Sequence, residues 1–177
     1  GNLCNASPAG DSVPAMVAAG VIARIAGPNG TRDVPAEEVP MGPGKTSLAK
    51  GEFIVSIFFP KKAANTGEAY LRFIPRTEMD IAVVGCGVCL TLDDSGTCTA
   101  ARVILGAVGP RIIDCTTAAD ALIGTKLDNA ALEAAGAAAS AAATPISDKR
   151  GTVEYRKKVA GVLTRRAATT ALERAKG

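Results

Sequence analysis

The run Ile81-Ala-Val-Val-Gly-Cys-Gly-Val-Cys-Leu-Thr-Leu92, the four residues Asp93-Asp-Ser-Gly96 and the run Thr97-Cys-Thr-Ala-Ala-Arg-Val-Ile-Leu-Gly-Ala-Val108 read as one β-hairpin. Both runs are apolar and rich in residues that favour strands. The residues between them are typical of a tight turn. Strands joined by hairpins pair antiparallel, so this stretch predicts the centre of an antiparallel sheet.

Further strands and three helices flank this hairpin. We expect Phe53–Phe59 to join the same sheet, which gives three main strands, and we read Tyr70–Ile74 as a shorter strand. After Val108 the pattern changes to helical spacing, with helices predicted over residues 116–123, 129–143 and 152–176. A sheet followed by helices that pack on one of its faces is an α+β arrangement.

The first part of the chain predicts a smaller unit. Residues 1–12 read as a polar loop, and a short helix with Pro14 in its first turn follows it. Two strands over residues 21–26 and 31–34 form a hairpin. We place the domain boundary near Lys50, which divides the chain into residues 1–50 and 51–177.

Composition excludes several classes of function. The net charge of +3 is weak, and the basic residues that crowd toward the C-terminus indicate a solvated helix face ahead of a nucleic-acid surface. The chain has no histidine, which removes the commonest general base and metal ligand. No stretch reaches the length of a membrane span. The five cysteines are an odd number without a disulfide rhythm, so we expect reduced thiols and a cytoplasmic protein.

A Cys-x-x-Cys pair lies in the first strand of the hairpin. Side chains alternate between the two faces of a strand, so Cys86 and Cys89 are expected on opposite sides and not at a shared metal. We predict no metal site and no catalytic nucleophile in this chain.

The opening segment, GNLCNASPAGD from Gly1 to Asp11, has the composition of a loop that surrounds a ligand. Glycine lets the backbone approach a phosphate or a flat ring, while Asn and Asp offer fixed polar contacts. Asp11 precedes a helix, so from chemistry alone it is either an N-cap or a ligand contact.

Three blocks resemble one known family. GNLCNASPAGDSVPA is similar to the second flavin motif of the FAD-binding subunits of molybdenum hydroxylases, with Asn2, Ala6, Pro8 and Asp11 in register and Gly1 as the second glycine of the motif's pair. Residues 70–82 resemble the family's Y-x-K-x-x-x-R-x-x-x-D-x-A, with arginine in place of lysine at position 72. Residues 148–156 resemble the run before the family's last helix.

The resemblance implies a division of labour among subunits. FAD would bind in this medium subunit, a molybdenum-pterin cofactor in a large partner subunit and 2Fe-2S clusters in a small partner subunit. Electrons would pass from the iron–sulfur clusters to FAD and on to an external acceptor. The family's N-terminal part of the FAD-binding domain is absent here, so residues 1–50 would be the C-terminal part of that domain and residues 51–177 the flavoprotein C-terminal domain.

The implied flavin contacts are Gly1, Asn2, Asp11, Arg72, Asp80 and Ile81. We expect Ile81 to pack near the isoalloxazine ring, with Asp11 and Ile81 marking two walls of one cleft. The arginines at positions 72 and 76 contact either the flavin or Asp80, or they form ordinary surface ion pairs. The alternative function is that of a flavin-free assembly module that docks partner subunits.

Overall fold

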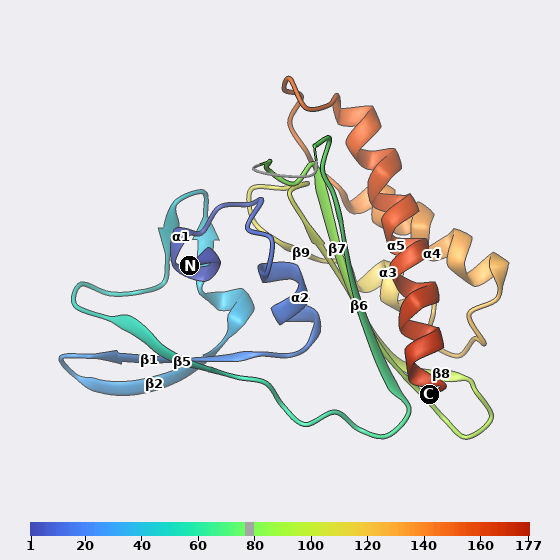
Figure 1. The fold of residues 1–177 in the computed structure, drawn as a ribbon, viewed down its shortest axis with the longest axis horizontal. Coiled ribbons are helices and arrows are strands. Elements are labelled where there is room, and N and C mark those ends of the chain that lie inside the picture. Colours follow the sequence, from blue (N-terminus) through green and yellow to red (C-terminus); the bar gives the residue numbers. More distant parts are fainter. Residues whose placement is uncertain (77–79) are drawn as a thin grey trace.

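The computed structural model describes residues 1–76 and 80–177, which form a body and a projecting arm (Figure 1). The body is built on a four-stranded sheet of order β6-β7-β8-β9 and the arm on a three-stranded sheet of order β2-β1-β5. Every strand pairing in both sheets is antiparallel. The predicted α+β class is confirmed.

The predicted hairpin forms the centre of the body. Strands β7 (Val84–Leu92) and β8 (Cys98–Gly106) are paired along their lengths. The Asp93 carboxylate closes the turn by accepting hydrogen bonds from the backbone N–H groups of Ser95 and Thr97, each at 2.9 Å. The two apolar runs pair with each other because a short turn joins them, and side chains of the turn stabilise it locally.

The predicted first residue of the hairpin's first strand was wrong. Strand β7 begins at Val84, whereas the prediction began the strand at Ile81. The Ile81 N–H donates to the carboxylate of its neighbour Asp80 at 2.8 Å, and the first backbone bond toward β6 is made by Val83. Ile81 therefore lies in the connection before the strand, where its side chain is half exposed.

Three helices cover one face of the body sheet, as predicted: α3 (Thr116–Asp120), α4 (Asn129–Ala142) and α5 (Val153–Ala175). The longer two begin at side-chain caps, because the Asp128 carboxylate and the Thr152 hydroxyl accept hydrogen bonds from backbone N–H groups of the first turn. The core beneath them consists of valine, leucine, alanine and cysteine. On the other face lies the short helix α2 (Val13–Ala18).

The membership of the two sheets corrects the prediction. Strand β5 (Phe53–Phe58) was expected in the body sheet but pairs with β1 (Ile22–Gly27), which also pairs with β2 (Gly30–Pro35). The body sheet is completed by β6 (Thr66–Phe73) and the two-residue β9 (Ile113–Asp114). The predicted three-stranded sheet is therefore four-stranded and has different members.

Hydrogen bonds to Glu52, in the loop before β5, explain why β5 pairs with β1. The Arg32 guanidinium on β2 donates two hydrogen bonds to the Glu52 carboxylate, at 2.9 and 3.0 Å, and Glu52 also accepts from the Ala49 N–H at 2.7 Å. These bonds hold the start of β5 beside the first hairpin and lower the pKa of Glu52 to about 2. The division of the chain at residue 50 itself stays a prediction, and β5 follows that position.

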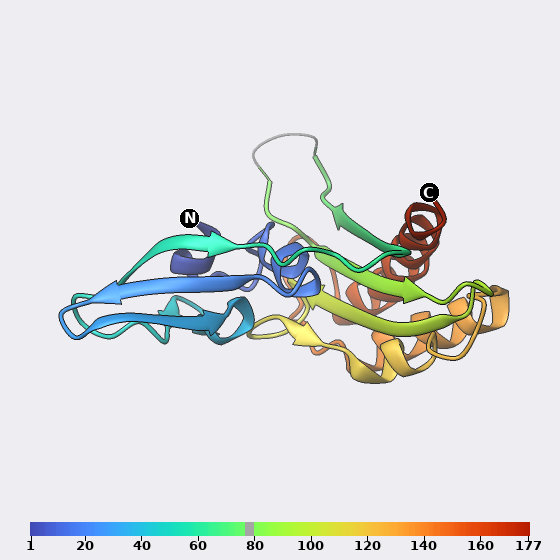
Figure 2. The same cartoon turned by 90° about the horizontal axis from the view of Figure 1, so that it is seen from below.

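The remaining elements are short. They are α1 (Asn2–Asn5), the 3-10 turn η1 (Ala36–Glu38), β3 (Pro40–Gly42) and β4 (Lys45–Thr46). Helix α1 corrects the prediction of a loop over residues 1–12, and buried Leu3 anchors it. Seen from below, the arm extends sideways from the body (Figure 2).

Candidate functional site

The opening segment is closed on itself by one side chain. The Asn2 side-chain oxygen accepts hydrogen bonds from the Ser12 hydroxyl at 2.8 Å and from the Ser12 N–H at 3.2 Å. Gly1 is exposed, and a Cβ added to it would meet no atom within 4 Å. The backbone at Gly1 is therefore open to a ligand, while Asn2 fixes the loop that carries it.

Asp11 is paired with Arg72 of β6, and it does not cap the helix that follows it. The N-cap of α2 is Ser12, which makes no side-chain capping bond. The ion pair joins the opening segment to the body. Next to it, burial and then the negative charge of Asp11 raise the pKa of Tyr70 to about 12, so this phenol is neutral at physiological pH.

A second charged group surrounds Asp80. Its side chain is only 3% exposed, and its carboxylate accepts hydrogen bonds from the Nε atoms of Arg76 at 3.1 Å and Arg150 at 3.5 Å. The bond from Arg76 is the main cause that lowers the pKa of Asp80. Of the alternatives for the two arginines, Arg76 contacts Asp80, whereas Arg72 contacts Asp11. Residues 77–79 of the second resembling block lie outside the described residues.

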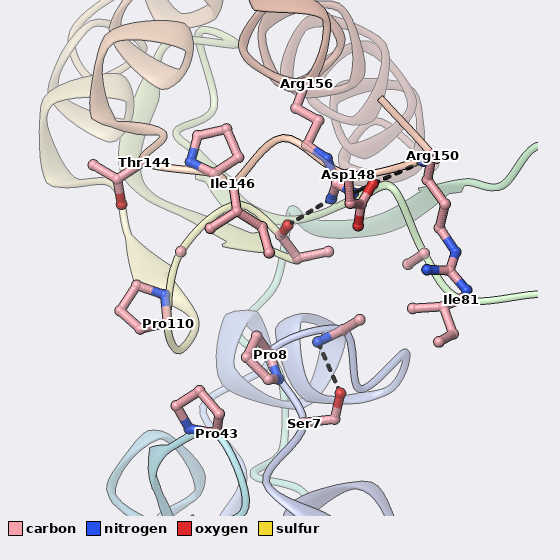
Figure 3. A pocket seen from close by; sticks show the side chains of 15 residues that line it. Ser7, Pro8, Pro43, Ile81, Pro110, Thr144, Ile146, Asp148, Arg150 and Arg156 are labelled. Carbon is pink, nitrogen blue, oxygen red and sulfur yellow. Dashed lines mark hydrogen bonds and ion pairs between the residues drawn. The ribbon is translucent and has the colours of Figure 1, made fainter. Parts of the chain in front are cut away.

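A pocket of about 360 Å³ lies between the opening segment and the body (Figure 3). Figure 3 shows Ser7, Pro8 and Pro43 along one side of the pocket and Ile146 on the side facing them, with Ile81 at one edge beside Arg150. Most of the lining is apolar, and the polar end is formed by three residues of the connection to α5 and its first turn: Asp148, Arg150 and Arg156.

Arg156 fixes that polar end from inside the protein. Its side chain is 5% exposed. It donates to the carbonyl oxygens of Val83 at 3.1 Å and Ala107 at 3.3 Å, and to the Asp148 carboxylate at 2.7 Å. The backbone N–H of Arg150, followed by the bond from Arg156, lowers the pKa of Asp148. This arginine therefore joins three segments that border the pocket.

The structure sorts the six predicted contacts into two groups. Gly1, Asn2, Asp11 and Arg72 lie together at the opening segment, and Asp80 and Ile81 lie at the connection before β7. Ile81 lines the pocket together with Ser7 and Pro8 of the opening segment, whereas Asp11 is not among the lining residues, so the predicted cleft wall at Asp11 was wrong. The role of these six residues as flavin contacts stays a prediction.

Two residues at this site were not among the six. Arg150 and Arg156 both lie in the third resembling block, residues 148–156, but no local pattern indicates that they contact Asp80 and Val83. The one sequence signal for them is their position: Arg150 and Arg156 lie on either side of the start of a helix that has apolar residues along one face. Such a pattern also describes a solvated helix end.

The two hairpin cysteines lie on opposite sides of β7, as predicted. Cys86 is buried under α5, where its thiol lies 3.4 Å from the Thr164 hydroxyl, and Cys89 packs against the cluster on the α2 side. Among residues 1–76 and 80–177, no group of three or more possible metal ligands is found. Over the same residues, no helix is long and apolar enough to cross a bilayer.

Comparison with known proteins gives matches along the whole chain. Residues 1–62 match the FAD-binding domain in molybdopterin dehydrogenase, and residues 69–171 match the CO dehydrogenase flavoprotein C-terminal domain. The carbon monoxide dehydrogenase medium chain of Afipia carboxidovorans is 36% identical over 99% of this chain and 60% of its own length. The putative xanthine dehydrogenase FAD-binding subunit of Escherichia coli K12 is 29% identical over 100% of this chain and 61% of its length.

Solved structures agree with the sequence matches. The reconstituted CO dehydrogenase from Oligotropha carboxidovorans superposes with a TM-score of 0.91 at 35% identity, over 98% of this chain and 60% of the matched one. The carbon monoxide dehydrogenase of Hydrogenophaga pseudoflava gives a TM-score of 0.92 at 33% identity, with the same coverage. The chain thus spans about 60% of the length of these relatives, and it belongs to the family of molybdenum hydroxylase flavoprotein subunits that includes the carbon monoxide dehydrogenase medium chain.

Proposed function

We propose that this chain is part of the FAD-binding electron-transfer subunit of a molybdenum-containing dehydrogenase. Electrons would arrive from iron–sulfur clusters, pass to FAD and leave to an external acceptor. The observation that carries the proposal is the pocket between the opening segment and Ile81, because it brings together the two segments whose sequences resemble flavin-contacting motifs.

The residues present fit FAD chemically. FAD combines an anionic diphosphate, a hydroxyl-bearing chain and a flat ring. Gly1 offers accessible backbone and Asn2 a polar side chain beside it, Asp11 offers acceptor oxygens for hydroxyl groups and Arg72 offers positive charge. Ile81 offers an exposed apolar surface to a ring. The bound cofactor would supply the redox chemistry, which the protein itself lacks.

The residues of this chain would hold the cofactor and orient it. The ion pair between Asp11 and Arg72 fixes the opening segment on β6, so that the polar contacts are set before a ligand binds. The Asp80 carboxylate, held ionised by its two arginines, positions the backbone that presents Ile81. Pro8 and Ile81 contribute apolar lining to the pocket, which would limit the access of water to a flavin ring bound there.

The proposal includes partners and location. From the family resemblance we infer a large partner subunit with the molybdenum-pterin cofactor and a small partner subunit with the 2Fe-2S clusters. The words "medium chain" in the name of one relative support partner chains of other sizes. All five cysteines are free, which supports a reducing compartment and hence the cytoplasm. A flavin-free docking module is the alternative function.

The visible spectrum separates these functions. We would co-express this chain with the segment of the Afipia carboxidovorans medium chain that lies outside the matched 60% of its length. The flavin absorbance of the purified pair would then be measured. Flavin near one equivalent is the expected result. A folded pair that contains no flavin and takes up none from added FAD would favour the docking module.

Asp11→Ala tests the site within that pair. Loss of one polar contact costs roughly 0.5–1.5 kcal/mol, so FAD retention should weaken about two- to ten-fold. Ile81→Ala should shift the flavin spectrum or potential more than the affinity. Asp94→Ala, at an exposed position of the β7–β8 turn, is the matched control. Unchanged affinity, spectrum and potential in the folded Asp11→Ala and Ile81→Ala proteins would show that these residues do not contact the flavin.

A further inference from the structure

Four prolines border the pocket beside Ile81 (Figure 3). They come from four segments that are distant in sequence: Pro8, Pro43, Pro110 and Pro145. A proline ring fixes the backbone angle φ of its residue, so these segments have less freedom to collapse into the space between them. Ile81 and Ile146 add exposed apolar side chains. The pocket is therefore a preformed apolar space that suits a flat, rigid group.

The charges that line this pocket do not cancel. Within residues 1–76 and 80–177, its charged lining residues are Asp148, Arg150 and Arg156, which is one carboxylate against two guanidinium groups. The 2.7 Å hydrogen bond from Arg156 to Asp148 pairs two of these charges. The positive charge of Arg150 remains at the polar end of an otherwise apolar space.

Asp80 offsets the charge of Arg150 only in part. Its carboxylate lies 3.5 Å from the Nε of Arg150 but 3.1 Å from the Nε of Arg76, so two arginines share one negative charge. The Arg76 side chain is 71% exposed, and water screens its charge. The Arg150 side chain is 26% exposed and lines the pocket. The surplus positive charge of this cluster therefore acts most strongly inside the pocket.

Arg150 also has donors to spare, whereas Arg156 is held in place. The Arg156 guanidinium donates to the carbonyl oxygens of Val83 and Ala107 and to the Asp148 carboxylate. In the described part of the chain, the Arg150 side chain donates one hydrogen bond, from its Nε to Asp80. Its terminal nitrogens are therefore available to an acceptor atom of a ligand.

We propose that Arg150 is the residue of this chain that stabilises the reduced flavin ring. The inference rests on the proposed function, which puts the ring in this pocket. The oxidised ring is neutral, and uptake of two electrons from the iron–sulfur clusters and one proton from solvent leaves it with one negative charge. A fixed positive charge beside the ring favours that anion, so Arg150 raises the reduction potential.

The reduction potential of the bound flavin tests this role. It would be measured by equilibration with a reference dye in the co-expressed pair, or in one chain that joins the two segments where the pair dissociates. Arg150→Gln removes the charge and should lower the potential by about 30 mV or more, since about 30 mV corresponds to a tenfold change in the equilibrium of a two-electron couple. Arg150→Lys keeps the charge and should restore most of the loss.

Two further variants separate charge from structure. Lys149→Gln removes a positive charge from the neighbouring exposed residue, which does not line the pocket, and should leave the potential unchanged. Asp80→Asn removes the carboxylate that partly offsets Arg150, so the potential should rise. Arg150→Gln and Asp80→Asn break the same ion pair, so a purely structural role predicts shifts of the same sign for both.

The results distinguish this inference from the proposed function. A folded pair or joined chain that takes up no FAD overturns both. Bound FAD whose potential is unchanged in Arg150→Gln, or falls equally in Lys149→Gln, overturns the role of Arg150 and leaves the proposed function standing. A fall in both Arg150→Gln and Asp80→Asn would mean that the ion pair only shapes the pocket, and it would also overturn the role of Arg150.

Discussion

Gly87→Ala should push helix α2 away from the body sheet. Gly87 lies in the middle of β7, paired with Tyr70 on one side and Ile104 on the other. An added Cβ would lie 2.6 Å from the Pro14 carbonyl oxygen and 3.2 Å from the Ala18 Cβ. The first contact involves backbone, which cannot rotate away as a flexible side chain can, so helix α2 must shift.

The magnitude follows from two opposing effects. Overpacking a well-packed contact costs typically about 1–3 kcal/mol. Replacing glycine by alanine in a strand recovers about 0.4–1 kcal/mol, because the unfolded chain loses freedom. Because the 2.6 Å contact is with backbone, the cost lies in the upper part of that range, about 2–3 kcal/mol, and the net loss is roughly 1–2.6 kcal/mol. In a chain of this size each kcal/mol lowers Tm by about 2–4 °C, so the expected fall is roughly 2–10 °C.

Urea unfolding and amide exchange would measure this effect. The unfolding midpoint should fall in Gly87→Ala, and the amides of α2 should exchange faster than those of α5. Gly42→Ala is the matched control, since Gly42 has no neighbour within 4 Å of an added Cβ. It should be neutral or slightly stabilising. Equal midpoints for Gly87→Ala and the unsubstituted chain would mean that α2 is not held against β7 as described.

Three further results are expected. Arg156→Met should lower the free energy of unfolding by about 1–3 kcal/mol, measured in urea, because it leaves the buried carbonyl groups of Val83 and Ala107 without donors; an unchanged free energy would contradict these two hydrogen bonds. The folded pKa of Asp80 is depressed below its ordinary 3.8, so its contribution to stability is present above that value and is lost as pH falls through the folded pKa. Asp80→Asn should therefore flatten the acid side of the stability profile, and an unchanged profile would count against the Arg76 and Arg150 contacts. Alkylation followed by mass spectrometry should modify exposed Cys4 rapidly and Cys86 only on unfolding, because burial raises the pKa of the Cys86 thiol to about 12.

The features that the sequence predicted correctly are local ones. The hairpin depends on the Asp93 turn, and helices α4 and α5 depend on the caps at Asp128 and Thr152. Each of these signals lies within a few residues of the element it specifies. The opposite orientation of Cys86 and Cys89 follows equally from the alternation of side chains in one strand.

The features that were missed depend on partners distant in sequence. The apolar pattern of β5 is compatible with either sheet, and the choice of β1 depends on the long-range contact between Arg32 and Glu52. The residues around Asp11 indicated either a cap or a ligand contact, and neither reading predicted its ion pair with Arg72, on a strand more than fifty residues later. The polar end of the pocket required Arg156 to reach Val83, which no local pattern encodes.

The distribution of aromatic residues connects the composition to the architecture. The chain has four phenylalanines, and three of them lie between Phe53 and Phe59, where they are exposed. The body core contains almost none and relies instead on close approach of small residues. A Cβ at Gly67 would lie 1.9 Å from the Ala171 carbonyl oxygen, so β6 and α5 touch nearly backbone to backbone. Large apolar side chains bury the most area per residue. With three of the four phenylalanines exposed on the arm, the body is therefore held together by close packing of small residues and not by burial of large rings.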